Sequence, residues 1–342
     1  MKQGFEIKNS DYKPEQKLMD DDRVKPNQKL EVLGILKEAL AVFSKNFRFI
    51  IFILLTTLPL FVFMVYYESL LQRTLVETSN ILRQTPLYVY EINYDSIIWQ
   101  NMETIFDSMT DDFVNGLVQL SFLYLVPLHL LEFCTVIVTV DLASKIGQEE
   151  RTMTLKEMIQ KPIYGARMGG IFVTYFQVLI LSTCMLLGLI WLVTNYSVWG
   201  RSPMFSLFSA AFYGAAFVAL LTKYLEWSAA WNMSIVISVL EGTYGFQALA
   251  LAGLFNKDSE RRGLLLMLVF FVWGLGLRSI CLCVGCNERG MDLVVIAQVS
   301  LFCLGHLLKW VACVVYFHDC KKYALEKKFD VEVGREIKAV DK

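Results

Sequence analysis

Long apolar runs alternate with short polar segments along most of this chain, and the alternation predicts helices that cross a membrane. A helix needs about 20 apolar residues to span the hydrocarbon core of a bilayer. Six runs are long enough, and we predict spans at residues 47–67, 114–140, 168–194, 204–238, 263–284 and 293–317. The fourth run exceeds one straight crossing, so we expect its helix to extend into the cytosol.

The composition narrows the class of protein further. Of the 342 residues, 55% are hydrophobic and 19% are charged, whereas a soluble globular protein averages about 25% charged residues. These values exclude intrinsic disorder, collagen, a secreted disulfide scaffold and a nucleic-acid-binding domain. A soluble protein of this length would have to bury all six apolar runs in one core, so we interpret the chain as an all-α, polytopic membrane protein.

Polar segments lie on both sides of the apolar part. Residues 1–30 carry too little apolar surface to order themselves, which predicts a disordered cytosolic tail. Residues 31–322 form the predicted six-helix membrane domain, and residues 323–342 form a second, charged tail. The chain does not begin with a positive segment followed by an apolar one, so we expect no cleaved signal peptide.

The positions of Lys and Arg predict the orientation of the spans. The net charge is only −1, yet basic residues concentrate before the first span, in the second and fourth connections, and after the sixth span. Cytosolic connections carry an excess of Lys and Arg, so both termini are expected in the cytosol. The acidic loop 68–113 is then non-cytosolic, and the membrane is the endoplasmic reticulum or the plasma membrane.

Three segments share one layout, in which an amphipathic helix is followed by a basic turn and a span; they cover residues 31–52, 152–172 and 242–270. In the first segment, apolar residues recur at steps of three and four, which is typical of one helix face. These residues are Leu33, Leu36, Leu40, Phe43 and Phe47. Thr154 and Glu157 give the second segment the spacing of a capping box. The apolar residues of the third are Phe246, Leu249, Ala250 and Leu254.

We interpret these segments as interfacial helices in the headgroup plane, each preceding one of three transmembrane hairpins in a pseudo-threefold bundle. Six basic side chains are expected at the membrane surface: Lys37, Lys45, Arg48, Lys156, Arg261 and Arg262. The alternative is that there is no repeat, because any cytosolic loop between spans tends to be amphipathic and basic.

Two short sequences within this layout resemble the signatures of a known family. One is Leu36-Lys37-Glu38-Ala39-Leu40 followed by Lys45-Asn46-Phe47, and the other is Ser238-Val239-Leu240-Glu241 followed by Tyr244-Gly245 and Ala248-Leu249. Both are similar to an uncharacterised plant family of six-span proteins and, more loosely, to the membrane domain of some bacterial glycerophosphodiester phosphodiesterases. The resemblance covers about residues 30–322 and implies the six-span fold. The bacterial activity belongs to a separate soluble domain, so the resemblance does not extend to it.

Polar side chains inside the predicted spans are candidates for a functional site, because burying them in hydrocarbon is costly. We select His129, Glu132, Glu226 and His306 as a candidate intramembrane site. These residues would line a polar cavity for a headgroup or an ion, with a proton relay through His129 and Glu132. In the alternative, the acids form static interhelical pairs, and Lys223 and Lys309 extend their side chains to the cytosolic boundary.

The cysteines and the missing motifs complete the site predictions. Cys281, Cys283 and Cys286 cluster at the non-cytosolic end of the fifth span, where two of them could form a disulfide or all could pack as small apolar residues. Cys320, beside two lysines, is a candidate for palmitoylation. The sequence contains no hydrolase, Walker or dinucleotide-binding motif, so we expect no enzymatic activity, no cofactor and no metal site.

Two functions are compatible with this sequence. The first is a non-enzymatic scaffold or lipid-organising factor of the endomembrane system or plasma membrane, with membrane lipids and membrane or cytosolic proteins as partners and no nucleic acid. The second is a transporter or channel for a small solute or lipid that uses the polar residues of the spans. A polar cavity that reaches His129 and Glu132 would favour the second, and a solid bundle the first.

Overall fold

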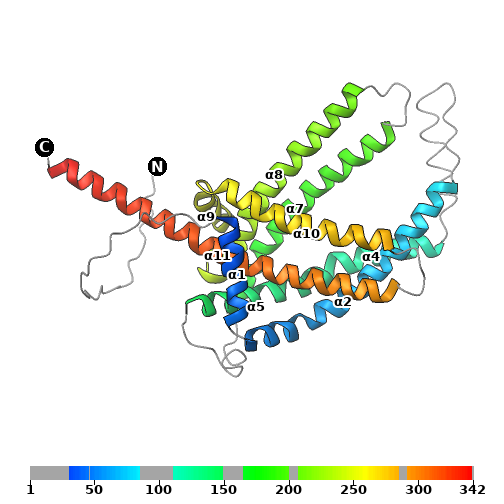
Figure 1. The fold of residues 1–342 in the computed structure, drawn as a ribbon, viewed down its shortest axis with the longest axis horizontal. Coiled ribbons are helices and arrows are strands. Elements are labelled where there is room, and N and C mark those ends of the chain that lie inside the picture. The colour runs from blue at the N-terminus through cyan, green and yellow to red at the C-terminus, as the bar shows by residue number, and fades with distance from the viewer. Residues whose placement is uncertain are drawn as a thin grey trace.

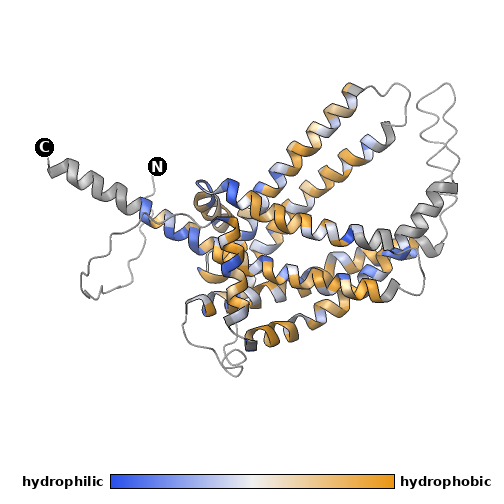
Figure 2. Ribbon diagram, viewed as in Figure 1, coloured by the Kyte–Doolittle hydropathy of each residue, from blue (hydrophilic) through white to orange (hydrophobic). Residues whose placement is uncertain are grey.

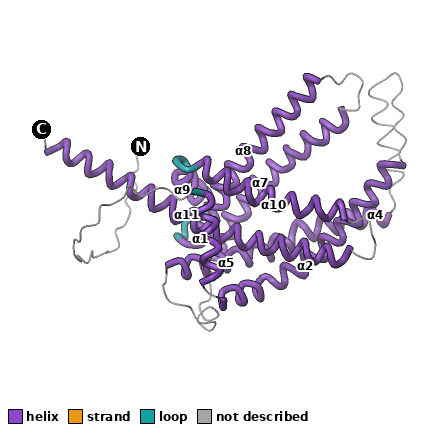
Figure 3. Tube along the Cα trace, viewed as in Figure 1, coloured by secondary structure: helices purple, strands orange, loops and turns teal. Residues whose placement is uncertain are grey.

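A computed structural model describes residues 31–45, 47–84, 111–148, 165–199, 207–284 and 291–340, and all structural statements concern these residues. Within them every regular element is a helix (Figure 3). Six helical stretches are long and apolar enough to cross a membrane: Arg48–Thr74, Val114–Gly147, Arg167–Tyr196, Phe208–Leu240, Glu260–Ser279 and Leu293–Lys327. The prediction of an all-helical chain with six candidate spans is confirmed. A multi-pass membrane protein is compatible with this fold.

Figure 1 shows the order of the elements. They are α1 (Val32–Lys45), α2 (Phe47–Gln84), α4 (Asp111–Leu123), η1 (Tyr124–Leu128), α5 (His129–Gln148), α7 (Gly165–Trp199), α8 (Leu207–Leu240), α9 (Phe246–Asn256), α10 (Glu260–Val284) and α11 (Met291–Val340). Helix α11 continues through most of the segment predicted as a charged tail. That segment contains four Lys and three Glu, which are strong helix formers.

Helix α11 lies at the centre of the packing and contacts α1, α2, α5, α8, α9 and α10. Its middle part carries the largest buried side chains, including Trp310, Tyr316 and Phe317. Met233 and Ile237 of α8 belong to the same core. The core therefore concentrates near one end of the bundle, which we call the α9 end. It comprises α1, residues 228–263, which include α9, and residues 306–327 of α11.

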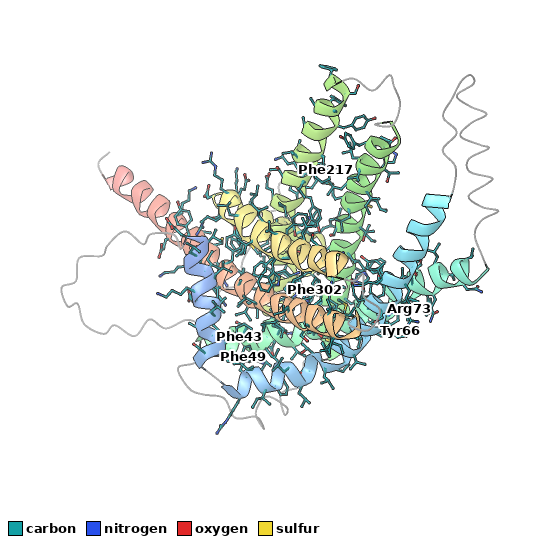
Figure 4. All side chains as sticks on the ribbon, turned by 45° about the vertical axis from the view of Figure 1, so that its right-hand side comes forward. Phe43, Phe49, Tyr66, Arg73, Phe217 and Phe302 are labelled. Atoms are coloured by element: carbon teal, nitrogen blue, oxygen red, sulfur yellow. The ribbon has the colours of Figure 1, made fainter. Side chains whose placement is uncertain are left out.

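Helix α7 packs mainly against α8, and we call the two helices the α7–α8 hairpin; α8 also packs against α9 and α10. Figures 1 and 4 show this hairpin diverging from α10 and α11, and Figure 2 shows it apolar along most of its length. Large apolar side chains are exposed on it, among them Leu187, Ile190, Trp191, Phe212 and Val218. This exposure is compatible with contact with hydrocarbon.

Helix α1 runs across the direction of α5 and α11 at the α9 end (Figures 1 and 4). Its buried face consists of Ile35, Ala39 and Val42, whereas Leu33 and Leu40 are 77% and 55% exposed. Leu33 and Leu40 of the predicted apolar face therefore do not pack on the bundle, and their contact with a membrane surface stays a prediction. Ile35, Ala39 and Val42 stand at positions i, i+4 and i+7, and they form a second apolar stripe that packs on the bundle.

At the corner between α1 and α2, the rings of Phe43 and Phe49 lie 5.6 Å apart, as Figure 4 indicates by their labels. Because Phe49 is fully buried, this pair fixes the direction in which the chain leaves α1.

Helix α9 packs through small residues rather than through its large apolar ones. Ala248, Ala252 and Asn256 are buried, whereas Phe246 and Leu254 are exposed. Small side chains let α9 approach α8 and α11 closely, which large residues would prevent. Phe246 and Leu254 of the predicted apolar face therefore do not pack on the bundle, and their contact with a membrane surface stays a prediction. The second expected interfacial helix, at 152–164, and Lys156 within it lie outside the described residues.

Candidate functional site

A widened helical turn sets the position of the candidate intramembrane residues on the second span. Residues Tyr124–Leu128 form one turn of π-helix that contains Pro127. Proline has no backbone N–H to donate, and its ring clashes with the carbonyl four residues earlier, so a regular α-helix is disrupted here. His129 follows immediately, and Glu132 lies one turn further along α5.

His129, Glu132 and His306 come together between α5 and α11. His129 Nδ1 lies 3.3 Å from Glu132 Oε2, and His306 Nε2 lies 3.8 Å from Glu132 Oε1. The Trp310 indole N–H donates a hydrogen bond of 3.0 Å to His306 Nε2. The structure thus joins three of the four residues of the predicted site, from two spans that are distant in sequence.

These contacts determine which hydrogen-bonding groups are already used. Because His306 Nε2 accepts from Trp310, a neutral His306 carries its proton on Nδ1. Among the described residues, no hydrogen bond satisfies that Nδ1–H. His129 and Tyr175 of α7 both interact with the Glu132 carboxylate. The Glu132 carboxylate is therefore held by its neighbours, whereas the Nδ1–H of His306 stays available to a ligand.

Lys309 lies one turn after His306 on α11. Its Nζ is 4.8 Å from the ring centroid of Trp310, which is a cation–π contact. Within the described part of the chain, no carboxylate lies within 4.0 Å of this ammonium. Glu226, the fourth predicted residue, is separate from the cluster: its carboxylate accepts a 2.8 Å hydrogen bond from Lys223 on α8.

A cavity of about 180 Å³ adjoins the cluster, between α8, α10 and α11. Its polar lining consists of Tyr224, Ser228, Asn232, His306 and Lys309. Its apolar lining is largely aromatic and includes Phe270, Phe271, Trp273 and Phe302. All these residues belong to candidate spans. Of the four residues of the predicted site, His306 lines this cavity, whereas His129, Glu132 and Glu226 do not.

A second polar cluster ties the α9 end together. Arg262 donates a hydrogen bond of 2.6 Å to Asp319 Oδ2, and the two side chains are only 16% and 15% exposed. The Tyr316 hydroxyl lies 2.6 Å from Asn256 Oδ1 and 3.0 Å from the Ser259 carbonyl oxygen. These contacts join the turn between α9 and α10 to α11, and we call them the α9-end network.

Sequence reasoning missed most of the α9-end network. The sequence placed Arg262 at the membrane surface, but in the structure its guanidinium forms an ion pair with Asp319. Asp319, Asn256 and Tyr316 were not selected at all. One available signal was the charge of Asp319 close to the end of an apolar span, where an acid needs a partner.

The residues of the second family-like signature form a tight turn between α8 and α9. Gly245 has a φ of +63°, and its N–H donates to Thr174 Oγ1 of α7 at 2.8 Å. Lys321 of α11 pairs with Glu241 at 2.7 Å. Ser238 and Ala248 are fully buried. The signature therefore specifies a turn, one ion pair and close helix packing.

The remaining predicted sites are placed as follows. Lys37, Arg48 and Arg261 are exposed, and the side chain of Lys45 lies outside the described residues. Cys320 is only 1% exposed. An acyl donor has no access to this thiol, so the palmitoylation prediction is not supported. The side chains of Cys281 and Cys283, and all of Cys286, lie outside the described part of the chain.

Comparison with models of protein families, with curated proteins and with solved structures found no match to this chain. The resemblance to the plant six-span family and to the bacterial membrane domain therefore stays a prediction. Among the described residues, no three His, Cys, Asp or Glu side chains are grouped as metal ligands.

Proposed function

We propose that this protein is a non-enzymatic, multi-pass membrane protein that organises lipids at the α9 end, which faces the cytosol. One observation carries the proposal: α1 lies across the end of the bundle and exposes Leu33 and Leu40 close to the exposed Lys37. A short helix with exposed leucines beside a basic residue is suited to the boundary between headgroups and acyl chains.

The energetics of such an interface favour lipid contact. Burying a leucine side chain stabilises the buried state by about 1.5–3 kcal/mol relative to exposure to water. A basic residue near an anionic leaflet adds about 1 kcal/mol. Phe246 and Leu254 of α9 are also exposed at this end, and Arg48 and Arg261 are exposed basic residues. The α9 end thus combines apolar anchors with positive charge.

The charge distribution supports the orientation. Arg48, Arg261 and the lysines near the end of the α11 span lie toward the α9 end, and cytosolic connections are the basic ones. With this orientation, α1 and α9 meet the anionic cytosolic leaflet. Both helices would act as interfacial helices, each preceding a transmembrane hairpin.

The test measures lipid selectivity of the purified full-length protein in bilayers. Spin-labelled phosphatidylserine and phosphatidylcholine report, by electron paramagnetic resonance, the fraction of each lipid held at the protein surface. We expect the triple variant Lys37→Gln, Arg48→Gln, Arg261→Gln to lose at least about fivefold of its selectivity for phosphatidylserine, which is the effect of about 1 kcal/mol from a single one of the three charges.

The matched control removes exposed charges elsewhere. Arg73 of α2 (Figure 4) and Arg278 of α10 are exposed near the opposite ends of their spans. The double variant Arg73→Gln, Arg278→Gln should keep the selectivity. Equal selectivity in the wild-type protein and the triple variant would reject the lipid-organising proposal.

A second function is favoured by the His129–Glu132–His306 cluster beside the cavity. Two histidines and a carboxylate within spans are suited to binding an ion or relaying a proton. Transport of a small solute is therefore the alternative proposal. Reconstituted flux that is lost in His129→Ala and Glu132→Gln would support it, and flux that survives both substitutions would exclude this cluster as the pathway.

A further inference from the structure

The cavity between α8, α10 and α11 carries two hydrogen-bond donors that no described residue satisfies. They are the ammonium of Lys309 and the Nδ1–H of a neutral His306, and the two residues are three apart on α11. Side chains at i and i+3 lie on the same face of a helix. A cation held in a membrane span without a carboxylate partner is costly, so a bound anion would stabilise it.

The charge surrounding these donors disfavours a ligand that carries two negative charges. Glu132 lies 3.8 Å from His306 Nε2 and interacts electrostatically with Lys309. One ammonium beside one carboxylate compensates a monoanion only in part and repels a dianion. A carboxylate therefore fits better than a phosphate monoester.

The walls of the cavity match an acyl chain. Phe270, Phe302 and Trp273 supply apolar surface, and all three belong to candidate spans. The volume is about 180 Å³, and a cavity of about 150 Å³ holds a benzene-sized molecule. The site thus accommodates a small headgroup with the first few carbons, and the cavity is only partly enclosed. The rest of a long chain would extend into the surrounding hydrocarbon.

We propose that this cavity binds the carboxylate end of a fatty acid that enters from the bilayer. Lys309 Nζ and His306 Nδ1–H contact the carboxylate oxygens, and the first part of the acyl chain packs against Phe270, Trp273 and Phe302. The site is separate from the surface of α1 and α9, so it does not rest on the lipid-organising proposal, and each can fail without the other.

The experiment uses the full-length protein in nanodiscs of phosphatidylcholine. A palmitic acid with a diazirine on its chain and a terminal alkyne is photo-crosslinked to the protein, and mass spectrometry locates the labelled peptides. Competition with oleate, oleyl alcohol and phosphatidate distinguishes a carboxylate site from an apolar crevice or a phosphate site. We expect labelling on α8, α10 or α11 that oleate suppresses and the other two amphiphiles suppress at least about tenfold less effectively.

Two pairs of variants separate charge from shape. Lys309→Met removes the ammonium and keeps most of the side-chain volume, whereas Lys309→Arg keeps the charge. Gly274 lines the cavity, and a Cβ there would meet Phe302 at 3.9 Å, so Gly274→Leu fills the cavity. Gly276 on the same helix has no atom within 4 Å of the position that a Cβ would take, which makes Gly276→Leu its control.

We expect Lys309→Met and Gly274→Leu to weaken oleate competition about tenfold, the loss typical of a charged hydrogen bond, and Lys309→Arg and Gly276→Leu to retain it. Unfolding temperature and monodispersity in detergent verify that each variant is folded. Equal competition by oleate and oleyl alcohol, stronger competition by phosphatidate, or full labelling in both Lys309→Met and Gly274→Leu would overturn the proposal.

Discussion

The α9 end and the outer part of the α7–α8 hairpin, residues 180–199 and 207–221, are built on different principles. At the α9 end, Arg262–Asp319, Tyr316–Asn256 and Lys321–Glu241 connect elements that are distant in sequence. On the outer hairpin, exposed aromatic and aliphatic side chains predominate. The first region is specified by protein contacts, and the second is suited to contact with hydrocarbon.

The physical properties of the bilayer explain why one region is held by specific protein contacts and the other exposes apolar side chains. Between helices already in hydrocarbon, apolar surface gives little drive to associate, so close packing through small residues and hydrogen bonds must supply it. Gly263 illustrates this at the α9 end, because a Cβ there would lie 2.8 Å from Ala229 Cβ and 2.9 Å from the Tyr316 hydroxyl. On the outer hairpin, Gly214 has no atom within 4 Å of such a position.

The largest difference in stability between the two regions is expected when Gly263 is replaced by a larger residue. We expect Gly263→Val to lower the free energy of unfolding by about 3 kcal/mol or more, because overpacking displaces both Ala229 and Tyr316. The free energy is measured by titration with sodium dodecyl sulfate in mixed micelles. Gly214→Val on the hairpin is the control and should change it by less than about 1 kcal/mol. Equal effects of the two substitutions would contradict the contrast.

The next largest effect is expected for the Arg262–Asp319 pair. Removing one partner leaves a buried charge without compensation, which costs about 3 kcal/mol. Arg262→Met and Asp319→Leu should each destabilise by this amount, and the double variant by clearly less than their sum. The exposed Lys327–Asp258 pair, 2.7 Å apart, is the control and should show a coupling below about 1 kcal/mol. If the coupling free energy between Arg262 and Asp319 were also below about 1 kcal/mol, this pair would not contribute to the stability of the α9 end.

The turn between α8 and α9 should respond more moderately. Gly245 has a φ of +63°, which side-chain-bearing residues rarely adopt, so Gly245→Ala should cost about 1–3 kcal/mol. Gly253 lies within α9 with open space around its Cβ position, so Gly253→Ala should instead stabilise the helix by up to about 1 kcal/mol. Thermal unfolding in detergent should show a lower unfolding temperature for Gly245→Ala and a higher one for Gly253→Ala. A lower unfolding temperature for both variants would show that α9 tolerates no added methyl group.

The sequence was sufficient for the helices but not for their contacts. Apolar runs found all six candidate spans, because the bilayer imposes their length. The cost of polar groups in hydrocarbon was enough to place His129, Glu132 and His306 in one candidate site, but it did not exclude Glu226, which pairs with Lys223 apart from the cluster. The faces of α1 and α9 that pack on the bundle were not predicted, because both helices carry more than one apolar stripe, and tertiary packing buried Ile35 and Ala248 rather than Leu33 and Phe246.

The smallest effect, and the one that most sharpens the comparison, is expected on the outer hairpin. Phe212 is 64% exposed on α8, so Phe212→Ala should change the free energy of unfolding by less than about 0.5 kcal/mol, since acyl chains replace the lost contacts. The buried Phe317 at the α9 end is the reference, and Phe317→Ala should cost about 3–5 kcal/mol. Both values come from the same titration in mixed micelles. If Phe212→Ala were as costly as Phe317→Ala, the exposed side chains of the outer hairpin would contact protein rather than acyl chains. Both regions would then be stabilised by protein contacts, and the contrast between them would be lost.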